Sequence, residues 1–109
     1  AQMSETIRIK RAALEEDGVT AALTVGDYAG RVQVYADVTL TGGTTPTAVL
    51  TLTKCDTSGG TYEDVQVMAT GTTYFLDSRN LGGFLKLAVE TTGSPTGIDI
   101  NLIVAGWTK

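Results

Sequence analysis

The sequence contains no histidine, one cysteine and two prolines among its 109 residues. Histidine is the usual base beside a nucleophilic serine or cysteine, so catalysis of that kind lacks its partner residue. A single cysteine, Cys55, excludes an intrachain disulfide, and with no histidine to activate its thiol we interpret it as a small residue tolerated at a strand end. These absences favour a protein that is not an enzyme.

Charge is also scarce. Charged residues make up 18% of the chain, and twelve acidic residues against eight basic ones give a net charge of −4 and a pI near 4.5. Binding to nucleic acid depends on clustered Lys and Arg that neutralise phosphates, so we predict no nucleic-acid partner.

Long apolar runs are missing too. No stretch reaches the roughly 18 apolar residues of a membrane-spanning helix, and we expect neither a membrane partner nor a signal peptide. The chain begins Ala1-Gln2, which suits a product synthesised in a cytoplasm and stripped of its initiator methionine.

What is abundant is threonine, valine and glycine, a composition typical of β structure. A chain of 109 residues suits one domain whose core needs neither disulfides nor metal. We divide it into an N-terminal arm or edge strand, residues 1–10, and a single β-sandwich domain, residues 11–109.

Apolar and polar residues alternate most regularly in residues 83–91 and 97–105. Side chains on a strand point to opposite faces with a period of two, so each stretch offers one apolar face. The linker between them contains Gly93, Ser94 and Pro95, and we predict an antiparallel hairpin around it. The residues that we expect to face the core are Leu85, Leu87, Val89, Ile98, Ile100, Leu102 and Val104.

Further strands are predicted at residues 6–10, 19–25, 30–40, 48–54, 61–69 and 72–77. In residues 61–69 we expect Val65, Val67 and Ala69 to face inward. Residues 11–17 contain helix-favouring side chains but are too few for an independent helix, so we predict a loop or a single turn there. About eight short strands separated by glycine-rich turns predict an all-β fold, an antiparallel β-sandwich of the Ig-like or jelly-roll kind.

Oxygen ligands suited to calcium cluster around one glycine-rich loop, in Asp56, Ser58, Glu63 and Asp64. Their spacing does not match the acidic loop with a distal Glu that typically binds this ion. We therefore predict no metal site and no cofactor.

The N-terminal strand is the first candidate partner surface. Ile7, Arg8, Ile9 and Lys10 form an amphipathic stretch able to add to the edge of another sheet. The basic residues Arg8, Lys10 and Arg11 have two interpretations: they contact acidic protein or nucleic acid, or they protect a solvated edge strand from stray pairing, and we favour the second.

A second candidate surface is formed by Phe84, Ile103 and Trp107, whose parity is opposite to that of the core rows. If Trp107 continues its strand, the three side chains form an outer apolar patch on the hairpin. Alternatively, Trp107 folds over the end of the sandwich and closes the core, and Phe84 meets a loop.

Three features follow one another in the second half of the chain. Residues 56–62 form a turn, Asp-Thr-Ser-Gly-Gly-Thr-Tyr, Asp77-Ser78-Arg79 follows a strand, and residues 84–104 alternate regularly. This succession, over residues 47–105, resembles small β-sandwich proteins of tailed-bacteriophage virions, in which Asp-Gly-Thr-aromatic, Asp-x-Arg and an alternating hairpin occur in that order; here the turn contains an insertion.

The resemblance implies a non-enzymatic structural protein. Proteins of this kind decorate or cement the capsid, or join head, neck and tail parts, as homo-oligomers in contact with the major capsid protein or another virion protein. The location implied is the virion, after synthesis in the host cytoplasm. Their N-terminal arms often reach onto a neighbouring subunit.

The alternative is a carbohydrate- or receptor-binding β-sandwich module of a phage tail or an adhesin. Such a module presents aromatic side chains on loops or on a concave face. The candidates are Tyr28, Tyr35, Tyr62 and Tyr74, of which Tyr35 and Tyr74 fall within predicted strands.

Overall fold

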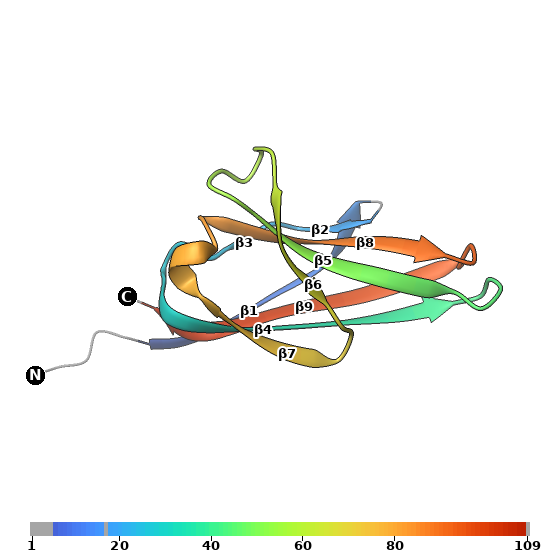
Figure 1. The fold of residues 1–109 in the computed structure, drawn as a ribbon, viewed down its shortest axis with the longest axis horizontal. Coiled ribbons are helices and arrows are strands. Elements are labelled where there is room, and N and C mark those ends of the chain that lie inside the picture. Colours follow the sequence, from blue (N-terminus) through green and yellow to red (C-terminus); the bar gives the residue numbers. More distant parts are fainter. Residues whose placement is uncertain (1–5, 17, 109) are drawn as a thin grey trace, which may run out of the picture.

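The computed structural model describes residues 6–16 and 18–108, and the side chains of residues 9–12 and 18–108. Two antiparallel sheets pack face to face, which confirms the predicted all-β sandwich (Figure 1). The elements are β1 (Thr6–Glu16), β2 (Val19–Thr20), β3 (Leu23–Thr24), β4 (Tyr28–Thr41), β5 (Thr47–Cys55), β6 (Glu63–Met68), β7 (Thr72–Asp77), the 3₁₀ turn η1 (Ser78–Asn80), β8 (Phe84–Thr92) and β9 (Gly97–Thr108).

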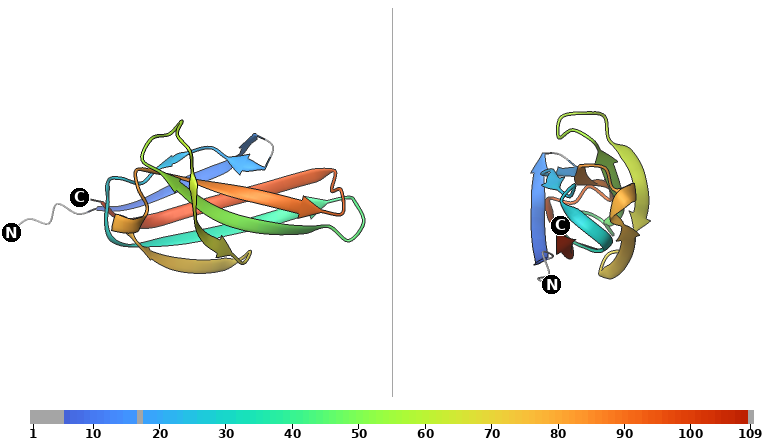
Figure 2. Two further views of the ribbon diagram at one scale, coloured as in Figure 1. Left: turned by 45° about the horizontal axis from the view of Figure 1, so that its top comes forward. Right: turned by 90° about the vertical axis from the view of Figure 1, so that its left-hand side faces the viewer.

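Sheet A contains β1, β9, β4 and β7 in that order, and sheet B contains β6, β5 and β8, with β2 and β3 paired to β8. The strand β1 joins the two: residues 6–13 pair with β9, and Leu14 and Glu16 pair with β2, with a register shift between them. At the opposite edge β6 crosses between the layers and turns into β7 (Figures 1 and 2).

The strand β1 is longer than predicted. It continues to Glu16, so the prediction of a loop or single turn is wrong for residues 11–16. Backbone pairing with β9 outweighs the weak helix preference of a stretch this short. The strand β1 passes through residue 10 without a break. Residues 6–13 do form the edge strand of sheet A, whereas Ala1 to Glu5 lie outside the described residues.

The predicted hairpin is wrong, although both of its strands exist. The strand β8 pairs with β5 in sheet B, and β9 pairs with β1 and β4 in sheet A. The connection is therefore an arch that carries the chain from one sheet to the other, and β4 to β5 is a second such arch (Figure 1). Two strands with one apolar face each can bury those faces side by side or across a core, and the alternation is the same in both cases.

The two arches lie against each other at the end of the sandwich remote from the described chain ends. The Thr44 amide donates to the Gly93 carbonyl over 2.9 Å, and the Thr96 amide donates to the Thr41 carbonyl over 2.8 Å. The hydroxyls of Thr47 and Thr92, which are direct cross-strand partners, share a further hydrogen bond. The turn residues thus pair with each other rather than with their own chain neighbours.

The predicted inward rows of β8 and β9 are confirmed. Leu85, Leu87, Ile100, Leu102 and Val104 are fully buried, Val89 is nearly so, and Ile98 packs on the core at its edge.

In β6 the predicted inward row is right only for Val65, which packs against the core. Val67 is 61% exposed, Ala69 is exposed as well, and Met68 is buried in their place. A register shift where Leu52 and Thr53 face Gln66 and Asp64 leaves Val65 unpaired and reverses the alternation that follows.

Tyr28 closes the core at the end where the described chain begins and ends. Its ring is buried against Gly106, where a Cβ atom would lie 3.1 Å from the ring, and its hydroxyl donates to the Val104 carbonyl over 3.2 Å. Burial, with a smaller contribution from the charge of Asp27, raises the pKa of Tyr28. The neutral phenol is therefore the form that the fold favours.

Replacing Tyr28 by Phe is expected to reduce the free energy of unfolding at pH 7 by about 1 kcal/mol, the usual effect of losing one buried hydrogen bond. Because the pKa of Tyr28 is higher in the folded than in the unfolded protein, the neutral phenol contributes its full stabilisation below the unfolded-state pKa near 10. This stabilisation is lost as the pH rises above 10. Urea unfolding between pH 7 and 11 should show the wild type losing stability more steeply than Tyr28→Phe. Parallel curves would contradict this interpretation.

Candidate functional site: the outer face of sheet A

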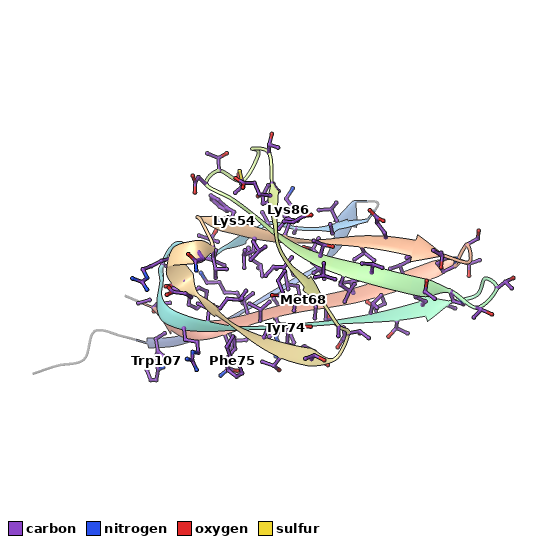
Figure 3. All side chains as sticks on the ribbon, in the orientation of Figure 1. Lys54, Met68, Tyr74, Phe75, Lys86 and Trp107 are labelled. Atoms are coloured by element: carbon purple, nitrogen blue, oxygen red, sulfur yellow. The ribbon has the colours of Figure 1, made fainter. Side chains whose placement is uncertain are left out.

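Among the described residues, sheet A exposes more large apolar side chains than sheet B does. Ile9, Phe75 and Trp107 are 60%, 57% and 47% exposed, and all three belong to sheet A. Figure 3 shows Phe75 and Trp107 pointing to the same side, away from sheet B. Sheet B contributes Val49 and Val67. Among the described residues, the two exposed aromatic side chains therefore both belong to sheet A.

The strand register places these residues in rows across the sheet. One row runs from Ile9 through Ala105 and Gln33 to Phe75. The next row runs from Arg11 through Ile103 and Tyr35 to Thr73. Directly paired residues of neighbouring strands project to the same face. We call the resulting surface the apolar face; it consists of Ile9, Tyr35, Phe75, Ile103, Ala105 and Trp107.

An open depression of about 530 Å³ lies between Trp107 and Phe75, with Gly30, Arg31 and Gln33 among its lining residues. The pairing of β4 with β9 shifts register between Ala29 and Val32, which marks an irregularity beside Gly30. Gly30 has a φ of 71° and no side chain, so this part of the face stays open.

Arg31 is the cation of this depression. Its guanidinium carbon lies 5.8 Å from the centre of the Phe75 ring, and among the described residues it forms no ion pair. The carboxylate of its cross-strand partner Asp77 forms an ion pair with Arg79 instead, with 2.7 Å between Oδ2 and the Arg79 Nη2. The side-chain hydrogen bonds from Arg79, helped by its backbone amide, lower the pKa of Asp77 to about 2. Arg31 therefore presents its donors to solvent.

Two of the predicted interface residues of β9 lie on the apolar face. Trp107 continues β9 and is exposed on its outer side, so it does not close the core, and Ile103 is half-buried two rows away. Phe84 does not join them. It belongs to β8 in sheet B, on the other layer, because β8 and β9 form an arch rather than a hairpin. The prediction of a single patch containing all three residues is wrong.

The residues predicted in β1 separate by parity. Ile9 lies on the apolar face, whereas Lys10 points to the opposite side of β1. There its ammonium donates to the Thr24 carbonyl over 2.6 Å and to the Asp27 carboxylate over 2.7 Å. Lys10 is thus part of the domain's own closure. The side chains of Ile7 and Arg8 lie outside the described ones.

Phe75 and Arg31 were missed at the sequence level. The adjacent pair Tyr74-Phe75 contained the signal, because neighbouring strand residues must face opposite ways. Tyr74 turns inward, packs against the core and accepts the Ala69 amide at its hydroxyl over 3.0 Å, so Phe75 faces out. Tyr35 lies on the apolar face, and of the other tyrosines Tyr28 is buried.

Other candidate sites are less developed. In the described part of the chain no three Asp, Glu, Cys or His side chains come together as metal ligands, around Asp56 and Glu63 or elsewhere. Cys55 is half-buried, with its sulfur 3.9 Å from the Thr57 hydroxyl. Tyr62 donates to the Ser58 carbonyl and lies under the Lys86 ammonium, 4.9 Å from the ring centre. The part of the chain that the structure describes contains no helix that is long and apolar enough to cross a bilayer.

Comparison with known proteins gives no matching family model, no similar curated protein and no similar solved structure. The chain's function must therefore be argued from its own residues, and the apolar face is the feature on which that argument depends.

Proposed function

We propose that this chain is a non-enzymatic structural protein of a tailed-phage virion, a capsid decoration protein or a head–tail component, which works through protein contacts made by the apolar face. The observation that carries the proposal is the grouping of exposed Ile9, Phe75 and Trp107 on one sheet face. Burying apolar surface stabilises an association by roughly 25 cal/mol per Å² before its costs are subtracted. A face of this kind is where a partner is expected.

Two further observations support a structural role. The sequence contains no histidine, and the apolar face combines aromatic and aliphatic side chains with the arginines Arg11 and Arg31 rather than with a nucleophile and a base. The virion assignment rests on the sequence pattern of residues 47–105, which resembles phage β-sandwich proteins; of its three features, the hairpin is replaced here by an arch between the sheets.

A second candidate function is carbohydrate or receptor binding by the same face. The depression places Trp107 and Phe75 beside the donors of Arg31 and Gln33. Aromatic rings can stack on the apolar side of a sugar while guanidinium and amide groups bind its hydroxyls. This arrangement differs from the tyrosine set expected from the sequence, and it would suit a module of a phage tail or an adhesin.

The proposed function is tested on purified particles of the phage that encodes the chain, by mass spectrometry. We expect the chain in a fixed ratio to the major capsid protein. The double variant Ile9→Ser with Phe75→Ser should be incorporated about tenfold less, because it loses two apolar anchors. Val67→Ser, which changes an equally exposed residue of sheet B, is the matched control and should be incorporated normally. Particles that lack the wild-type chain would refute the proposal.

A further inference from the structure

We propose further that the apolar face binds a second copy of this chain, through a two-fold axis that runs along the strands between β9 and β4. The inference rests on the proposed function, since it names the occupant of the same face. It follows from the order of residues in the rows of sheet A.

A two-fold axis in this position exchanges β9 with β4, and β1 with β7, within each row. In the row from Ile9 to Phe75 it therefore sets Ile9 of one copy on Phe75 of the other. Among the described side chains of sheet A these are the two most exposed large apolar ones, at 60% and 57%. Because the interface is symmetric, the contact forms twice.

The flanking positions are complementary as well. Trp107 pairs with Ala29 of β4, beside the register shift that contains Arg31, so the axis brings Trp107 over Ala29 and the neighbouring Arg31 of the second copy. This arrangement allows an indole ring to stack on a guanidinium group. The depression beside Gly30 and Arg31 provides about 530 Å³ of open space for that ring. In the next row Ile103 meets Tyr35, so an aliphatic side chain packs on an aromatic one.

Charges on the face are also placed without conflict. Arg11 of one copy comes opposite Thr73 of the other, and Asp37 comes opposite Asn101. Within a single copy the Asn101 amide already donates to the Asp37 carboxylate over 3.2 Å, so the same pair of groups is compatible across the axis. An axis across the strands through Ile103 would instead set Trp107 on Asp99. The axis along the strands therefore sets Ile9 on Phe75 and Ile103 on Tyr35, places Ala105 on Gln33, and opposes no like charges among the described side chains.

The size of the face suits a reversible dimer. Four strands spaced by about 4.8 Å and four rows spaced by about 6.8 Å cover roughly 500 Å² on each copy, or about 1,000 Å² in total. This is the lower limit for a specific interface, so we expect an association that depends on concentration.

Trp107 is the only tryptophan of the chain and lies in the proposed interface, so its fluorescence reports directly on contact. Light scattering from about 1 µM to about 1 mM should show the mass rise from 11.4 kDa toward twice that value. Over the same range the emission maximum should shift to the blue, and quenching by acrylamide should decrease.

The axis itself is tested by two complementary substitutions. Ile9→Lys and Phe75→Glu should each raise the dissociation constant tenfold or more, because each replaces an apolar anchor by a charge. A mixture of the two variants should recover the dimer. The mixed pair opposes the new lysine and the new glutamate at one contact and keeps Ile9 on Phe75 at the other. Val67→Lys, on sheet B, is the matched control and should leave the constant unchanged, with circular dichroism confirming that all variants fold.

Several results would overturn the dimer. They are a monomer at every concentration, a dimer indifferent to both substitutions, and single variants that fail to recover when mixed. A monomer whose Trp107 emission shifts on adding lactose or sialyllactose would overturn it in favour of the carbohydrate-binding candidate. A chain that is monomeric yet incorporated into virions would overturn the dimer alone and leave the proposed function intact.

Discussion

Leu87→Asp is expected to abolish folding, and Ile100→Asp is expected to do the same. Both side chains are completely buried. Leu87 lies beside its cross-strand partner Leu52 of β5, which is buried as well. No cation reaches this part of the described core, so the carboxylate would be buried without a partner or would have to be neutralised. The combined cost exceeds about 5 kcal/mol, which equals or surpasses the whole stability of many domains of this size.

Circular dichroism during urea unfolding measures this effect. We expect neither variant to show a cooperative transition. Val67→Asp is the matched control on the outer side of sheet B, where the side chain is 61% exposed, and it should change the free energy of unfolding by no more than about 0.5 kcal/mol. A soluble, cooperatively folding Leu87→Asp protein would show that the assigned inner row of β8 is wrong.

Gly43→Ala and Gly93→Ala are each expected to reduce the free energy of unfolding by about 3 kcal/mol, through the contact between the two arches. Gly43 and Gly93 have φ values of 74° and 81°, which cost a side chain about 1 kcal/mol. A Cβ atom at Gly43 would also overlap the Gly93 carbonyl, and one at Gly93 would lie 2.5 Å from the Thr44 carbonyl. Backbone atoms cannot rotate away, so the arches must separate and lose the bond from Thr44 to Gly93.

Gly71→Ala separates the two causes. Gly71 has a φ of 75°, but no atom lies within 4 Å of the position its Cβ would occupy. The free energy of unfolding of Gly71→Ala should therefore fall by only about 1 kcal/mol, the cost of the backbone conformation alone. Equal losses at all three glycines, measured by urea unfolding, would show that the close approach of the arches contributes nothing to stability.

The sequence predicted individual strands well because alternation is a local property. The inner row of β9, Ile100, Leu102 and Val104, and the outward direction of Trp107 follow from a period of two within one strand. The prediction failed in β6, where a bulge at Val65 reverses the faces, because pairing with β5 and not the alternation decides where the extra residue is accommodated.

The candidate site was only partly predictable for the same reason. Ile103 and Trp107 were found from the parity of one strand, and Ile9 was predicted on a separate N-terminal surface. Phe75 and Arg31 were not predicted, and only the pairings of β1, β9, β4 and β7 bring these residues together. Phe84 was assigned to the wrong surface because its strand belongs to the other sheet. Lys10 was predicted to belong to a partner surface, yet its ammonium pairs with Asp27, in the turn that precedes β4.

The sequence by itself determined an all-β chain, the inner rows of its last two strands and the absence of a histidine base. Only the tertiary structure decided that the glycine-rich turns are arches, which strands are neighbours and which exposed residues share a face. The physical reason is that alternation is fixed by the geometry of a single strand, whereas neighbours are chosen by the apolar surfaces that must cover one another. In this chain those surfaces are far apart in sequence, as in the pairing of Val34 with Val104.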